Sequence, residues 1–173
     1  MQLNFFNRPH FENGSINKIS DVLKELGIKN PLICTDPGLA SIGMTDKIRG
    51  LISNEIAPTF FEETPANPTE KAVVVALNLY PANNCDGVIG FGGGSSMDLG
   101  KAVAMMANHE GNVINYAINE GGYGKIKETI PMCAIPTTSG TGSEICIGAV
   151  IILNDGRKLI LASEHLRPKA AIC

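Results

Sequence analysis

Three consecutive glycines, residues 92–94, stand between a short apolar run and a stretch with helical periodicity. A glycine turn lets the backbone approach a ligand closely, and the helix behind it offers unpaired N–H groups and the positive end of its dipole. This arrangement predicts a site for an anionic group, above all a phosphate. Ser95 and Ser96 follow directly, and they are able to cap the helix or to donate to the same phosphate. The alternative interpretation is a tight turn that needs small residues and binds nothing.

Two familiar phosphate loops do not match this turn. The Rossmann pattern G-x-G-x-x-G fails because, counted from Gly92, its last position is Met97. The P-loop fails because Ala102 follows Lys101 at the position that requires a hydroxyl. Any phosphate site here therefore has another architecture.

A second polar segment, residues 136–143, follows the buried-strand pattern of residues 132–135. Its threonines, serines and glycines are too polar and too flexible for regular structure, which indicates a functional loop.

The elements that must position both loops alternate between strand and helix. Apolar runs predict strands over residues 32–35, 59–61, 87–91 and 132–135. Helical spacing predicts helices over residues 15–26, around 48–52, over 67–80 and from 95 to about 106. Parallel strands need crossover connections, so this alternation predicts an α/β fold with a parallel sheet covered by helices on both faces.

Two local signals complete this outline. Asn67, followed by Pro68 and by Glu70, is typical of a helix N-cap. Asp155-Gly156 lies between two apolar strands within residues 149–161 and predicts an added β-hairpin with a two-residue turn at positive φ.

Composition and charge narrow the class of partner. The net charge is -3, and no cluster of Lys or Arg occurs, which argues against nucleic acid and anionic membranes and favours a small molecule. Residues 1–7 lack the pattern of a leader, and no run approaches the roughly 20 apolar residues of a membrane span. We therefore expect a cytoplasmic protein. The 5 cysteines form neither a disulfide framework nor a zinc pattern, so buried thiols are expected.

The two loops together carry a resemblance to a known family. Residues 92–101 read GGGSSMDLGK, and residues 136–144 read PTTSGTGSE. The first is similar to the signature G-G-G-S-x-x-D-x-x-K of the iron-containing alcohol dehydrogenases, and the second resembles their cofactor loop P-T-T-x-G-T-G-S-E. Thr35-Asp36, residues 65–69 and residues 166–168 extend the likeness over essentially the whole chain.

The resemblance implies NAD as cofactor and a role for each matching residue. Gly93, Gly94 and Ser95 match the residues that cradle the pyrophosphate of the dinucleotide. The hydroxyl-bearing residues that match the cofactor-lining part of the second loop are Thr137, Thr138 and Ser143.

Four further residues match the family, and each also has a simpler interpretation. Asp36 matches the acid that binds the adenosine ribose and disfavours NADP, but Asp-Pro-Gly is also a turn former. Asp98 matches a position near the nicotinamide, but a first-turn carboxylate also suits the helix dipole. Lys158 matches a ribose contact and is otherwise a solvated hairpin lysine. Asn67 matches a cofactor-side residue, and the helix cap explains it without a ligand.

The metal site of the family has no counterpart in this sequence. In the family an Asp and three His of a helical second domain hold Fe²⁺ or Zn²⁺, after an Asp-Pro beyond the strand that matches residues 171–173. His10, His109 and His165 lie far apart and form no H-x-x-x-H pair. We therefore expect a truncated chain without metal ligands, able to bind the cofactor but not to turn over, with a divalent metal only in the full-length protein. An apolar surface left by the absent domain would favour a homo-oligomer.

These observations favour one function and leave others open. Residues 1–173 are expected to form the NAD-binding domain of a metal-dependent dehydrogenase that interconverts alcohols with aldehydes or ketones. One alternative is a non-catalytic module that binds NAD or ADP-ribose, and another is a relative of glycerol dehydrogenases. Acyl transfer is disfavoured because no G-x-S-x-G occurs.

Overall fold

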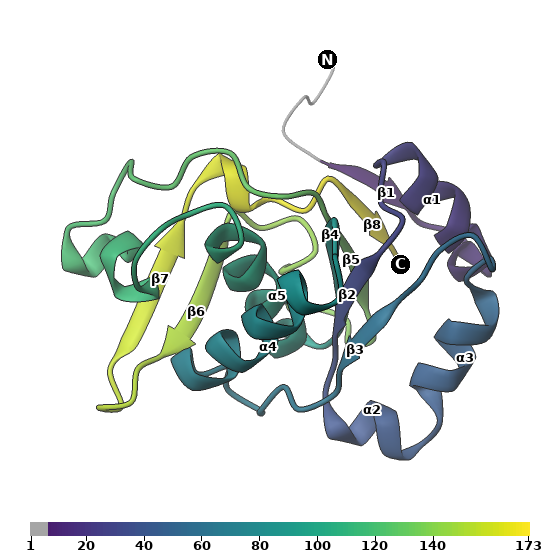
Figure 1. Cartoon of the computed structure of the whole chain (residues 1–173), viewed down its shortest axis with the longest axis horizontal. Helices are drawn as coiled ribbons and strands as arrows, with labels where there is room; N and C mark the ends of the chain where they lie inside the picture. The colour runs from purple at the N-terminus through teal and green to yellow at the C-terminus, as the bar shows by residue number, and fades with distance from the viewer. Residues whose placement is uncertain (1–6) are drawn as a thin grey trace.

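A six-stranded parallel sheet forms the centre of the computed structural model, which describes residues 7–173 (Figure 1). The strand order is β1-β8-β5-β4-β2-β3, and each neighbouring pair is parallel. A second, two-stranded sheet pairs β6 with β7 in antiparallel orientation. The strands are β1 (Arg8–His10), β2 (Pro31–Cys34), β3 (Thr59–Phe61), β4 (Gly87–Gly92), β5 (Met132–Pro136), β6 (Gly148–Ile152), β7 (Lys158–Ala162) and β8 (Ala170–Ile172).

Helices cover both faces of the large sheet, so the α/β prediction is confirmed. Because successive side chains of a strand point to opposite faces, Leu32 packs toward α4 and α5 while Ile33 packs toward α1 and α3. The helices are η1 (Ser15–Lys18), α1 (Ile19–Glu25), α2 (Pro37–Ser41), α3 (Met44–Leu51), α4 (Glu70–Ala82), α5 (Gly94–Met106), η2 (Val113–Tyr116), η3 (Ile118–Glu120) and η4 (Glu164–Leu166). Within residues 7–173, no helix is long and apolar enough to cross a bilayer.

The order of the strands creates a crevice between β2 and β4. The chain leaves β2 toward β3 on one side and leaves β4 toward β5 on the other, although β2 and β4 are neighbours. In open parallel sheets, ligands bind at the carboxyl ends of the strands where the direction of winding reverses. Asp36 follows β2 and the glycine turn follows β4, so the topology places both at this crevice.

The predicted hairpin is present, but its turn differs from the prediction. Residues 153–157 connect β6 to β7, and Leu153 N–H donates to the carbonyl of Arg157. Gly156 alone has positive φ (85°), whereas a two-residue turn of the predicted kind needs it at both central positions. The side chain of Asp155 instead accepts from Arg157 N–H at 3.0 Å and stabilises a longer loop with glycine at its left-handed position.

The N-cap predicted at Asn67 is wrong by two residues. Helix α4 is capped by Thr69, whose hydroxyl accepts from Ala72 N–H at 3.2 Å. The preceding segment is held extended because Ile152 N–H donates to the carbonyl of Pro68 at 2.8 Å. Pairing with β6 therefore moves the start of α4 to a later residue and leaves Asn67 in the connecting segment.

Five elements were not expected from the sequence: β1, α2 and the short helices η2, η3 and η4. Strand β1 pairs with β8 at the edge of the sheet, and α2 directly follows Asp36, where a simple turn was predicted. The first helix begins at Ser15 as predicted, but its first four residues form the 3-10 helix η1, and the Ser15 hydroxyl donates to the carbonyl of Cys173. Residues 1–6, on which most of the expectation about a leader rests, lie outside the described residues.

The five thiols are unpaired, and three of them, Cys34, Cys85 and Cys133, are buried as expected. Cys146 is an exception because it is exposed. Burial raises the pKa of Cys34 and of Cys133 to about 12, and the thiolate is the nucleophilic form. At pH 8, iodoacetamide should therefore modify Cys146 rapidly and modify Cys34 and Cys133 only after denaturation, which peptide mass spectrometry over time will show. Equal rates for the three thiols in the native chain would contradict this packing.

Candidate functional site

The glycine turn at the end of β4 contains three residues with different constraints. Gly92 has φ of 142°, and a Cβ there would lie 2.6 Å from Ser96 Oγ, so the fold itself requires glycine. Gly93 is extended (φ -76°, ψ -172°), and a Cβ would meet only Thr138 Oγ1 at 3.6 Å. At Gly94 the nearest atom would be Thr141 Cβ at 3.5 Å. Since neither backbone nor packing demands glycine at 93 and 94, the turn-only interpretation does not explain them.

Two cavities lie on either side of this turn. The first, which we name the Asp36 cavity, has a volume of about 520 Å³ and lies over the ends of β2 and β4. It brings together five of the residues predicted from the sequence: Asp36, Gly93, Ser95, Thr137 and Thr138.

The second cavity, named the Asp98 cavity, has a volume of about 220 Å³ and lies between α5 and the β6–β7 hairpin. It also collects five predicted residues: Asn67, Gly94, Ser95, Asp98 and Lys158. Ser95 lines both cavities, and its hydroxyl donates to the carbonyl of Ala66, which ties the turn to the 65–68 segment. A group bound at the turn therefore has room on both sides.

Asp36 combines the two interpretations that its sequence allows. It is the N-cap of α2, with Oδ1 accepting from Leu39 N–H at 3.1 Å. Its second oxygen, Oδ2, lies 3.1 Å from the position that a Cβ on Gly92 would occupy, at the wall of the Asp36 cavity. The helix cap thus fixes one carboxylate oxygen and leaves the other for a ligand.

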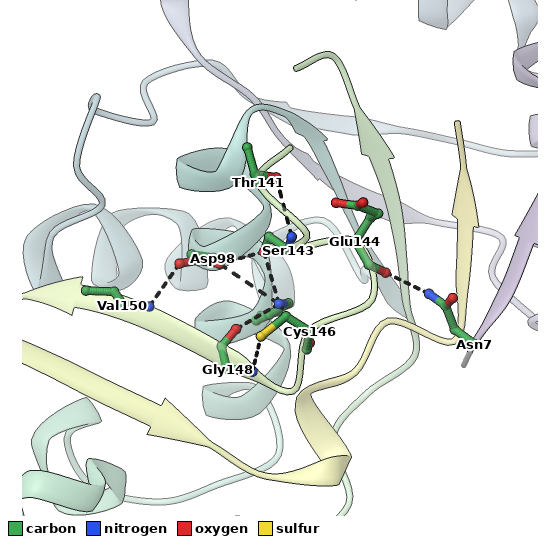
Figure 2. A network of polar contacts seen from close by, with 9 residues as sticks. Asn7, Asp98, Thr141, Ser143, Glu144, Cys146, Gly148 and Val150 are labelled. Atoms are coloured by element: carbon green, nitrogen blue, oxygen red, sulfur yellow. Dashed lines mark hydrogen bonds and ion pairs between the residues drawn. The ribbon is translucent and has the colours of Figure 1, made fainter. Parts of the chain in front are cut away.

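Ser143 lies in a different place from the other predicted residues. It is 6% exposed and lines neither cavity. Its hydroxyl donates to Asp98 Oδ1 at 2.6 Å and accepts from Lys101 Nζ at 3.0 Å, as part of the network in Figure 2. The structure therefore brings Ser143 behind Asp98.

Comparison with known proteins agrees with this geometry. The sequence profile described as "Iron-containing alcohol dehydrogenase" matches residues 7–173. The chain belongs to the iron-containing alcohol dehydrogenase family.

Relatives of the family match nearly all of this chain. The chain is 44% identical to 4-hydroxybutyrate dehydrogenase of Cupriavidus necator over 95% of its own length and 43% of the relative. It is 32% identical to alcohol dehydrogenase 4 of Schizosaccharomyces pombe over 91% of this chain and 37% of the relative. The chain thus spans less than half the length of these relatives.

Solved structures of the family share the fold. NADH-dependent butanol dehydrogenase A of Thermotoga maritima superposes with a TM-score of 0.88 at 28% identity, covering 99% of this chain and 43% of that one. Sulfoacetaldehyde reductase of Bifidobacterium kashiwanohense in complex with NAD+ superposes with a TM-score of 0.87 at 26% identity. The match covers 99% of this chain and 46% of that one. The α/β domain described above is therefore the nucleotide-binding domain fold of iron-containing alcohol dehydrogenases.

Lys101 ends the first motif of this family member, but no role was predicted for it from the sequence. It is fully buried, and desolvation lowers the pKa of its ammonium group, an effect that the neighbouring Asp98 opposes. The sequence contains a signal for a buried lysine beside Asp98. Lys101 follows Asp98 by three positions, which places both on the same helical face, and it stands between Gly100 and Ala102 in an apolar helix. Thr64 and Ser96 also line the Asp36 cavity, and only Ser96 was considered from the sequence.

Lys158 lies at the start of β7, where its side chain lines the Asp98 cavity. Asn119 holds this strand, donating to the carbonyl of Lys158 at 3.1 Å and accepting from Ile160 N–H at 3.2 Å.

The described residues contain no cluster of the kind that holds a metal ion. Within residues 7–173, no three side chains of His, Cys, Asp or Glu gather as a metal site requires. His109, for example, accepts from Lys127 N–H through Nε2 at 2.9 Å just beyond the end of α5.

Proposed function

We propose that residues 1–173 form the NAD-binding domain of a metal-dependent dehydrogenase that interconverts alcohols with aldehydes or ketones. In this proposal the divalent metal belongs to the complete protein and is held by residues outside this chain. The cofactor, when bound, accepts or donates the hydride, and this chain binds and orients it.

The observation that carries the proposal is the pair of glycines that the fold does not require. Without side chains at 93 and 94, the backbone N–H groups at the start of α5 are open to a diphosphate. The two cavities meet at Ser95 on either side of that position. A dinucleotide placed there has one nucleoside in the Asp36 cavity and the other in the Asp98 cavity.

The residues around each cavity suit a ribose. A carboxylate accepts hydrogen bonds from vicinal hydroxyls, and each cavity has one, with Lys158 as a donor in the second. Following the family resemblance, we assign the adenosine ribose to Asp36 and the nicotinamide ribose to Asp98. Thr137 and Thr138 add hydroxyls beside the diphosphate position.

The names of relatives suggest the substrate class to test first. The 44% identical relative is a 4-hydroxybutyrate dehydrogenase, so hydroxy acids should be tried alongside short alcohols. The proposal is tested by calorimetric titration of this chain with NAD, and the absence of binding would refute it.

A second function, nucleotide binding without catalysis, is favoured by the lack of a metal ligand set within residues 7–173. Both proposals expect this chain to bind NAD and to form no NADH from alcohols with added Fe²⁺ or Zn²⁺, as followed by absorbance at about 340 nm, and only the first expects the complete protein to form NADH. Turnover by this chain alone would show that the chemistry does not need further residues.

Replacing Asp36 tests the preference for NAD over NADP. Asn keeps an oxygen that accepts from Leu39 N–H, so Asp36→Asn preserves the cap of α2 while it removes the charge. We expect NADP to bind about tenfold more tightly than to the wild-type chain, because the repulsion between the carboxylate and the 2′-phosphate is lost. Calorimetric titration with NAD and NADP gives the ratio.

The matched control is Glu63→Gln, which removes an exposed carboxylate that lines neither cavity. It should leave the NADP to NAD ratio unchanged. If Asp36→Asn behaves like this control, Asp36 does not set the cofactor preference.

A further inference from the structure

Lys101 joins helix α5 to the segment that leads into the β6–β7 hairpin. Its side chain is 0% exposed, and Nζ donates to the carbonyl of Cys146 at 3.0 Å and to the carbonyl of Gly148 at 2.8 Å. The third donor of the ammonium group goes to Ser143 Oγ at 3.0 Å. All three N–H groups thus have acceptors, which makes the buried charge tolerable and fixes its position.

The bond from Lys101 determines what the Ser143 hydroxyl can do. Because Ser143 Oγ accepts from Nζ, its own hydrogen is directed to Asp98 Oδ1, at 2.6 Å. Val150 N–H donates to the other carboxylate oxygen, Oδ2, at 2.9 Å (Figure 2). Each oxygen of Asp98 is therefore held by one donor.

Charge supports the same arrangement. Nζ of Lys101 lies 4.0 Å from Asp98 Oδ1, so the buried ammonium has a counter-ion beside it. The side chain of Asp98 is 19% exposed and lines the Asp98 cavity, whereas Lys101 and Ser143 line neither cavity. Of the three side chains Lys101, Ser143 and Asp98, only that of Asp98 belongs to a residue that lines the cavity.

We propose that Lys101 and Ser143 are positioning residues that hold Asp98 as a fixed hydrogen-bond acceptor for a hydroxyl-bearing ligand in the Asp98 cavity. This inference rests on the proposed function, in which that ligand is the second ribose of NAD. Ser143 then acts through Asp98 and does not contact the dinucleotide, contrary to the role that the family resemblance suggested.

The two cavities give this proposal a specific signature. The network shares no residue with the lining of the Asp36 cavity. Breaking the network should therefore weaken ligands that carry the second ribose and spare those that lack it. NAD and ADP-ribose carry it, and ADP does not.

The test is calorimetric titration of the 173-residue chain with NAD, ADP-ribose and ADP. The central variant is Ser143→Ala, which removes one oxygen and leaves Lys101 its two carbonyl acceptors. We expect NAD and ADP-ribose to bind about tenfold more weakly and ADP to stay within about twofold, since one charge-assisted bond is lost. Lys101→Met should give the same pattern, and Ser143→Ala decides the question alone if Lys101→Met does not fold. Ser139→Ala, an exposed serine of the same loop, is the matched control and should change nothing.

A double variant separates positioning from contact. If Ser143 acts through Asp98, Ser143→Ala combined with Asp98→Asn should bind NAD no more weakly than Asp98→Asn alone. If the double variant loses NAD affinity by the product of the two single losses, Ser143 contacts the nucleotide independently of Asp98. That result would overturn the proposal. An equal fall for all three ligands, or unchanged NAD affinity in Ser143→Ala, would overturn it too. If the wild-type chain binds none of the three, the proposed function fails together with this inference, which distinguishes that case from the others.

Discussion

Gly93→Val should abolish most of the NAD affinity of this chain and leave its fold intact. The backbone at this position is extended and open to any residue, and the new side chain would project toward Thr138, into the Asp36 cavity. A diphosphate displaced by the side chain loses at least two charge-assisted bonds to N–H groups, each worth about 1.5 kcal/mol, so we expect about 100-fold weaker binding. Calorimetry measures the affinity, and thermal unfolding checks the fold.

Gly50→Val is the matched control for this substitution. Gly50 lies within α3, and a Cβ there has no neighbour within 4 Å. The control should bind NAD like the wild-type chain and keep α3, since valine is a better helix former than glycine. Wild-type affinity in Gly93→Val would refute the assignment of the diphosphate to the glycine turn.

Unlike Gly93→Val, which should keep its fold, Gly90→Ala should lose stability. Gly90 lies in β4, where a Cβ would be 2.8 Å from Met97 Cα and 3.3 Å from the carbonyl oxygen of Ser96. These are backbone atoms of α5, so the helix must move away from the sheet to admit one methyl group. We expect the free energy of unfolding in urea to fall by about 2 kcal/mol, within the range for overpacked cores.

Gly100→Ala provides the comparison on the other side of the same contact. Its Cβ would meet the flexible end of Met132, Cε at 3.0 Å, and Val88 Cγ1 at 3.3 Å. The gain in helix propensity, about 1 kcal/mol, should offset this crowding. Equal destabilisation by Gly90→Ala and Gly100→Ala would contradict the view that contact with the α5 backbone, and not crowding in general, excludes a side chain at position 90.

The sequence predicted which strand ends lie side by side better than it predicted local boundaries. The triple glycine, the polar loop after β5 and the acid after β2 all follow buried strands, and parallel strands bring their carboxyl ends to one edge. Their proximity could therefore be expected from the alternation of strands and helices. The start of α4 could not be expected from the sequence, since Asn67 and Thr69 are both good caps. The hydrogen bond from Ile152 N–H to the carbonyl of Pro68 decides between them.

Long-range partners explain the other differences. Strand β1 is short and has no apolar alternation, and it forms because β8, more than 150 residues later, offers an edge to pair with. The hairpin turn follows the bonds between Asp155 and Arg157, which the dipeptide Asp-Gly does not specify. Such choices depend on neighbours that local sequence does not contain.

The sequence by itself determined the α/β class and the family, because these follow from periodicity and from two long motifs. Only the tertiary structure decided which residues line the two cavities. It placed Asp98 at a cavity, put Ser143 behind it and buried Lys101 between α5 and the hairpin. The physical reason is that a motif fixes spacing along the chain, whereas burial and hydrogen-bond partners depend on segments more than 40 residues apart.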